Sequence, residues 1–159
     1  MQAESLTQKS IGFFIKTSGY LLIVTAAAKL VSSFGSVRVL NHLDPVFFIP
    51  FRYLLQATAI AEIIVALICF LGKSRQFQSG AVAILSSNFL LYRFGLYWLG
   101  FHELCPCLGN LSAMLPISPQ ATDVVMKIIL LFLLIGSYST LLWLWCQKKL
   151  ASSSHDKLA

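Results

Sequence analysis

Four long apolar stretches constrain most strongly what this chain can fold into. They cover residues 11–31, 51–72, 79–101 and 122–146. An α-helix rises ~1.5 Å per residue, so ~20 apolar residues cross the ~30 Å hydrocarbon core of a bilayer. The sequence therefore predicts an all-α fold, a four-helix transmembrane bundle over residues 11–147. We expect a short N-terminal segment at 1–10 and a disordered polar tail at 148–159.

Composition agrees with a membrane protein. Of the 159 residues, 57% are hydrophobic and 11% are charged, whereas soluble domains are roughly 45–50% apolar. The net charge of +6 comes from basic residues at the ends of the apolar stretches rather than from one basic stripe. Lipid phosphates are therefore the expected partner, and nucleic acid is not.

The distribution of basic residues predicts the orientation. With a cytoplasmic N-terminus, the cytoplasmic side receives six basic residues, and the opposite loops hold Arg38 and Arg52. This bias favours two cytoplasmic termini, as in a multi-pass protein of a bacterial inner membrane. The small residues in "TAAAKL" at 25–30 would suit a cleaved signal peptide, but Lys16 interrupts its apolar region, which favours an uncleaved span.

Two cysteines stand one residue apart in "HELCPCLGN", residues 102–110. On the outer face, where disulfides persist, Cys105 and Cys107 favour redox chemistry. The ring that they would close is very small and strained, which is typical of labile rather than structural disulfides. His102 lies three residues before Cys105 and could accept a proton. The predicted catalytic residues are therefore Cys105, Cys107 and His102.

Two other interpretations of this segment stay open. His102, Glu103, Cys105 and Cys107 offer four ligands for zinc or copper, although the spacing is shorter than the usual C-x₂₋₄-C and no second pair lies on this side. An inert pair is the other alternative. The remaining cysteines, Cys69 and Cys146, fall near the cytoplasmic ends of their stretches and are predicted to be packing residues.

Basic residues gather in the outer part of the predicted bundle. Lys29, Arg52 and Lys127 lie within ~8 Å of the outer boundary and Arg93 lies ~10 Å below it. Positive charge there would favour the thiolate of the cysteine pair. The alternative for Lys29, Arg52 and Lys127 is that they extend to lipid headgroups.

Glu62 and Arg93 fall inside the apolar stretches. Glu62 is ~17 Å below the outer face and Arg93 ~10 Å below it, so a long Arg side chain could close the gap. Because charges in a bilayer are costly, the sequence predicts a Glu62–Arg93 pair with a functional role. A pair that only fixes helix register, or a neutral protonated Glu62, are the alternatives.

Aromatic residues surround Arg93 in "NFLLYRFGLYWLGFH", residues 88–102. Trp and Tyr at this depth are typical of an interfacial belt. An aromatic pocket beside a cation would instead suit a flat cofactor such as quinone. The candidate cofactor-binding residues are Arg93, Tyr92, Tyr97, Trp98 and Glu62. No residue is assigned to a metal site.

Several of these features together resemble the MauE and DoxX-like membrane proteins. They are "AAAKL" at the end of the first stretch, "LDP" before the second, the Glu in "AEIIVAL", and C-x-C-x-G before the fourth. The resemblance covers residues from about 19 to 145, and Leu108 stands where relatives often have an aromatic residue. It implies a four-helix bundle linked to redox processes, since MauE is associated with maturation of methylamine dehydrogenase and DoxX-like relatives with quinone-coupled sulfur or thiol oxidation. It further implies that Cys105 and Cys107 are the redox pair and that Lys29, Asp44 and Glu62 accompany them.

The predicted function is thiol–disulfide exchange or electron transfer at the outer face. Cys105 and Cys107 would cycle between dithiol and disulfide, Arg93 and Lys127 would favour thiolate or an anionic substrate, and quinone would accept the electrons. The client would be an extracytoplasmic protein or another membrane subunit. The alternatives are a non-catalytic membrane anchor or assembly subunit, and a metal-handling protein.

Overall fold

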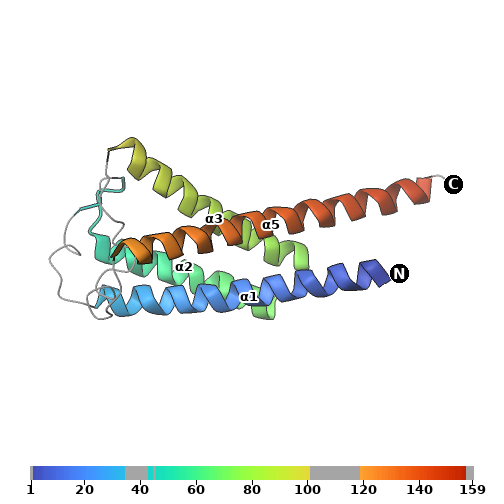
Figure 1. Cartoon of the computed structure of the whole chain (residues 1–159), viewed down its shortest axis with the longest axis horizontal. Helices are drawn as coiled ribbons and strands as arrows, with labels where there is room; N and C mark the ends of the chain where they lie inside the picture. The colour runs from blue at the N-terminus through green and yellow to red at the C-terminus, as the bar shows by residue number, and fades with distance from the viewer. Residues whose placement is uncertain (1, 35–42, 45, 101–118, 157–159) are drawn as a thin grey trace.

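The computed structural model describes residues 2–34, 43–44, 46–100 and 119–156. Within these residues the chain forms four α-helices and no strand. They are α1 (Gln2–Ser33), α2 (Phe51–Leu71), α3 (Arg75–Trp98) and α5 (Pro119–Asp156) (Figure 1). The predicted all-α, four-helix architecture is confirmed.

Three of the helices are long and apolar enough to cross a membrane, over Thr7–Ser33, Phe51–Leu71 and Asp123–Lys149. The third helix, α3, has 24 residues and therefore sufficient length. It is more polar than the others because Ser86, Asn88 and Arg93 interrupt its apolar sequence. The apolar character of the molecule is thus strongest in α1, α2 and α5.

The first and last helices extend furthest beyond the predicted spans. The first, α1, begins at Gln2, inside the expected N-terminal segment 1–10. The last, α5, continues to Asp156, so most of the segment 148–159, which we expected to be disordered, is helical. The sequence "QKKLASSSHD" at its end contains no glycine or proline, so a helix that is already formed can propagate through it.

Both ends of the chain lie at one end of the bundle, together with the short connection from α2 to α3 (Figure 1). At this terminal end, the side-chain amide of Gln78 donates to the carbonyls of Cys69 (3.0 Å) and Gly72 (2.8 Å), which caps α2. The guanidinium of Arg75 donates to the Gln8 carbonyl and fixes α1 to the start of α3. These contacts hold the helices together where the chain reverses.

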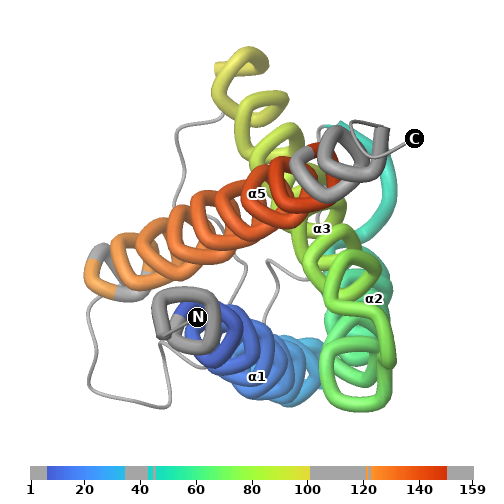
Figure 2. The backbone as a smooth tube through the Cα atoms, turned by 90° about the vertical axis from the view of Figure 1, so that its right-hand side faces the viewer, coloured from blue at the N-terminus to red at the C-terminus, as the bar shows by residue number. Residues whose placement is uncertain are grey.

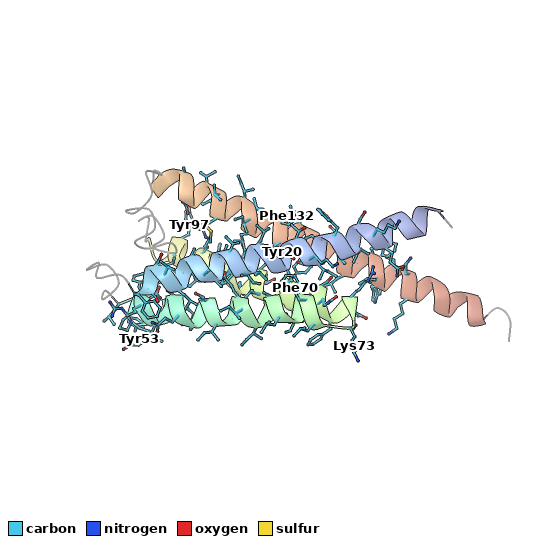
Figure 3. The ribbon with its side chains drawn as sticks, turned by 90° about the horizontal axis from the view of Figure 1, so that it is seen from below. Tyr20, Tyr53, Phe70, Lys73, Tyr97 and Phe132 are labelled. Atoms are coloured by element: carbon cyan, nitrogen blue, oxygen red, sulfur yellow. The ribbon has the colours of Figure 1, made fainter. Side chains whose placement is uncertain are left out.

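Close helix packing is concentrated in the half of the bundle nearest the termini. The buried apolar core there draws on all four helices: Ile11, Ile15, Leu22, Ala66, Cys69, Val82, Leu85 and Leu133. Gly19 lets α1 approach α2, since a Cβ atom there would lie 3.0 Å from the Phe70 ring. Tyr20 meets the same ring edge-on, with centroids 5.0 Å apart (Figure 3).

The opposite half is more open. Both views show the C-terminal end of α3 leaning away from α1 and α2 (Figures 1 and 2). Helices α1 and α3 end, and helices α2 and α5 begin, at this open end. The candidate site is a cavity whose lining residues come from all four helices and lie toward this end.

Candidate functional site

A cavity of about 600 Å³ lies between the four helices. Its wall is formed by some of the residues between positions 22 and 29 of α1, 51 and 62 of α2, 85 and 93 of α3, and 126 and 133 of α5, with Val46 and Phe47 from the turn before α2. Most of the lining is aliphatic or aromatic, and a small number of polar side chains face the same space. Size and lining are those of a small-molecule site, which typically has ~300–1,000 Å³ and few polar groups.

An ion pair forms the most buried polar group of this wall. Lys29 Nζ lies 2.5 Å from Glu62 Oε1, and the two side chains are 6% and 2% exposed. Side chains tilt toward the N-terminus of their own helix, so on the antiparallel α1 and α2 these two point toward each other. The ammonium also lies 4.6 Å from the centre of the Phe89 ring on α3. The pair therefore connects three helices at the cavity wall.

The predicted Glu62–Arg93 pair is wrong. Glu62 pairs with Lys29, because α1 and α2 lie side by side along their length and bring these residues to the same depth. Arg93 Nη2 instead contacts Asp123 Oδ1 at 3.1 Å. The suggestion that Lys29 extends to lipid headgroups is wrong as well, since its ammonium is buried.

Asp123, at the start of the apolar part of α5, is a site residue that the sequence analysis did not single out. Besides Arg93, its carboxylate binds Lys127, with Oδ2 and Nζ 2.7 Å apart. The Asp-to-Lys spacing of four residues at a helix start was the signal available in the sequence. The Arg93–Asp123–Lys127 cluster ties the diverging α3 to α5 beside the cavity.

Asp44 builds the turn that closes one side of the cavity. Its Oδ1 accepts hydrogen bonds from the backbone N–H groups of Val46 and Phe47, both at 2.8 Å. This is the local pattern in which an Asp side chain replaces a backbone partner in a turn. Oδ2 accepts a hydrogen bond from the Tyr92 hydroxyl of α3, and the Phe47 ring stacks on Tyr92 with centroids 5.9 Å apart. Asp44, which is fully buried, thus attaches the turn to α3.

The structure brings together three of the five predicted cofactor-binding residues. Glu62, Tyr92 and Arg93 line the one cavity. Tyr97 and Trp98 lie outside its wall and are 69% and 78% exposed, with Tyr97 near the open end (Figure 3). Their exposure agrees with the alternative of an interfacial aromatic belt.

The predicted catalytic residues Cys105, Cys107 and His102, and the candidate metal ligand Glu103, lie outside the described residues. Within the described part of the chain, no three His, Cys, Asp or Glu side chains form a group able to hold a metal ion. Cys69 and Cys146 are free thiols. Cys69 is buried against Gly19, as predicted for a packing residue, whereas Cys146 is exposed.

No protein-family model, curated protein or solved structure matches this chain. The resemblance to the MauE and DoxX-like proteins therefore stays a prediction. The candidate site is defined by its own geometry, which is an apolar cavity with a buried Lys29–Glu62 pair on one wall and Tyr92 and Arg93 on another.

Proposed function

We propose that the protein is an integral membrane thiol–disulfide oxidoreductase that exchanges electrons between Cys105 and Cys107 and a quinone held between its helices. The observation that carries the proposal is the cavity, which is large, mostly apolar and lined by a few polar groups. Such a site suits a flat lipophilic ring better than it suits a water-soluble substrate.

The residues around the cavity fit this class of cofactor. Phe47, Phe51, Phe89 and Tyr92 supply aromatic surface for a ring. Lys29 and Arg93 supply N–H donors and positive charge for the ring oxygens. The Asp44 turn shields the ring from water on one side, since Val46 and Phe47 belong to the wall.

The chemistry balances without a further reactant. Oxidation of two thiols to a disulfide releases two electrons and two protons, and a quinone takes up the same number in becoming a quinol. His102 would accept a thiol proton. The segment that carries the cysteines joins α3 to α5, and both helices contribute wall residues near the joined ends, namely Arg93 and Met126. This connectivity supports transfer between the cysteine pair and the cavity.

We further propose that all four helices cross a bacterial inner membrane, with both termini cytoplasmic and the cysteine pair in the oxidising compartment. The excess of basic residues near the terminal end supports this orientation. The client would be an extracytoplasmic protein or a neighbouring membrane subunit whose thiols reach the outer face.

The test uses the purified full chain in lipid vesicles and a mass-tagged maleimide. We expect two tags to be lost when a benzoquinone that is substituted at every ring carbon, and so cannot add to thiols, is given to the reduced protein, and to be regained after treatment with a reductant. A Cys105→Ser, Cys107→Ser variant should show no quinone-dependent change, and a Cys69→Ser, Cys146→Ser control should behave like the parent. If the number of tags on the parent does not fall with excess quinone, the redox proposal is wrong and the membrane-anchor alternative is favoured.

A further inference from the structure

The two oxygen atoms of Glu62 are in different situations. Oε1 accepts the short contact from Lys29 Nζ at 2.5 Å. Oε2 is buried and has no hydrogen-bond partner among the described residues. Thr25 lies beside this carboxyl group, but its hydroxyl donates to the Leu22 carbonyl of its own helix at 3.1 Å. An unpaired carboxylate oxygen in an apolar interior is costly, so a donor is expected to complete it.

The unpaired oxygen belongs to a side chain of the cavity wall. Both Glu62 and Lys29 line the cavity, and Glu62 is 2% exposed. The Lys29 ammonium has three N–H donors, of which one is used by Glu62 and another faces the Phe89 ring. The pair on this wall therefore offers one unpaired acceptor, Oε2, and a further N–H donor of the Lys29 ammonium.

A hydroxyl group matches this arrangement, because it donates one hydrogen bond and accepts another. A carbonyl oxygen could use the Lys29 donor but would leave Glu62 Oε2 unpaired. We infer that the Lys29–Glu62 pair is a binding subsite for the hydroxyl of a lipophilic ligand, with the hydroxyl donating to Glu62 Oε2 and accepting from Lys29 Nζ. This inference rests on the proposed function only in taking the cavity as the ligand site.

Within the proposed function, the subsite selects the reduced cofactor. A quinol carries hydroxyl groups, whereas a quinone carries carbonyl groups. The subsite therefore binds the quinol, which forms when the thiols are oxidised, more tightly than the quinone. The side chains of Leu22, Leu55 and Leu133 give the cavity an apolar surface for the rest of the ligand. A glycerolipid with a free hydroxyl, such as a diacylglycerol, shares the same chemistry.

The experiment measures binding to the full chain in detergent by calorimetry under nitrogen, with Cys105 and Cys107 replaced by serine in the parent and in every variant, so that no thiol reacts with the quinone. The probes are a decyl-substituted benzoquinone, its quinol and dioctanoylglycerol. For the parent protein we expect the quinol to bind about tenfold more tightly than the quinone, since one charge-assisted hydrogen bond separates them. Equal affinities for quinol and quinone would overturn the inference.

Glu62→Gln replaces an acceptor with an NH₂ donor at nearly constant shape. We expect the ratio of quinol to quinone affinity to fall to about one or below, and the ratio does not depend on the fraction of folded protein. Ser137→Ala is the matched control, because it removes a buried hydroxyl that lies outside the cavity wall, and it should keep the parent ratio. A ratio unchanged by Glu62→Gln would overturn the inference.

The outcomes separate this subsite from the proposed function. Glu62-dependent binding of dioctanoylglycerol without binding of quinone or quinol would support the hydroxyl subsite and overturn the quinone proposal. If quinone oxidises the thiols but the ratio of quinol to quinone affinity does not depend on Glu62, the proposed function is supported and the hydroxyl subsite is overturned. Absence of binding by all three probes would overturn both.

Discussion

At the scale of single residues, the Lys29–Glu62 pair combines two charges that the bilayer interior would exclude separately. Each is almost fully buried, and the contact between them is short. A buried pair gains little over apolar residues of similar volume, but removal of one partner leaves the other uncompensated. The pair is therefore costly to disrupt, which makes it a reliable fixed element of the cavity wall.

This asymmetry gives a measurable expectation. Lys29→Met should lower the free energy of unfolding by about 3 kcal/mol, because the Glu62 carboxylate loses its counter-charge. The double variant Lys29→Met, Glu62→Leu should cost clearly less than the sum of the two single changes, since it leaves no charge unpaired. Unfolding in detergent with increasing dodecyl sulfate measures all three variants. Strictly additive effects would contradict the direct coupling.

The same pair shows which part of the site could be predicted from the sequence and which could not. Glu62 was correctly singled out as an ionisable group inside an apolar stretch, but Arg93 was the wrong partner. Depth along a helix can be counted from the sequence, whereas the neighbour across the interface depends on which helices touch. Counted depth favoured Arg93 over Lys29, and only the packing of α1 against α2 shows that Lys29 is the partner.

At the scale of elements, the turn before α2 acts as one unit with α3. Asp44 holds the backbone of Val46 and Phe47, and it receives the Tyr92 hydroxyl. One side chain thus shapes the turn and attaches it to the helix beside the cavity. The attachment of Asp44 to Tyr92, 48 residues away, is a tertiary contact that no local sequence pattern contains.

Tyr92→Phe should loosen this turn without changing the ring. A hydrogen bond to a charged group contributes about 1.5–3 kcal/mol, and its loss leaves one oxygen of buried Asp44 without this donor. We expect faster amide hydrogen exchange at Val46 and Phe47, measured by mass spectrometry of the detergent-solubilised protein. Tyr20→Phe, on an exposed residue of α1, is the control and should leave that exchange unchanged.

Glycine sets the distance between α1 and α5. A Cβ atom on Gly136 would lie 2.1 Å from the Phe14 ring, so Gly136→Ala forces the ring or the helix to move. We expect a loss of about 1–3 kcal/mol in the free energy of unfolding, as for other overpacked interfaces. Gly80→Ala on α3 is the matched control, since no atom lies within 4 Å of its Cβ position. That change should stabilise the helix by about 1 kcal/mol, and equal effects of both changes would contradict the packing argument.

At the scale of the whole molecule, the architecture follows from the hydrophobic pattern. The second stretch, predicted at 51–72, is observed as Phe51–Leu71, because Pro50 and Gly72 bound it on both sides. The other boundaries shift by more, since helices continue through polar residues that no breaker interrupts. The sequence predicted a pocket beside Arg93, but the residues of α1 and α5 that complete its wall could not be predicted, because they depend on how the helices assemble.

The arrangement predicts which segments share a side of the membrane. Lys73→Cys and Gln147→Cys, each in a chain whose four native cysteines are serines, lie toward the terminal end. Phe48→Cys lies at the open end. In intact cells, we expect a membrane-impermeant maleimide to label Phe48→Cys and to label the other two only after lysis. Labelling of all three from one side would contradict a bundle whose helices cross the bilayer.

The Lys29–Glu62 pair also bears on how the chain enters the bilayer during synthesis. Insertion of a lone charged residue at the centre of a span costs about 2.5–3.5 kcal/mol, and Glu62 lies near the middle of α2, so α2 is a poor candidate for release from the translocon without α1. Their charged residues are separated by 33 positions in the sequence and neutralise each other once the helices are side by side. The first helix is therefore expected to wait at the lateral gate until the second has emerged, so that the two partition into lipid together as a hairpin.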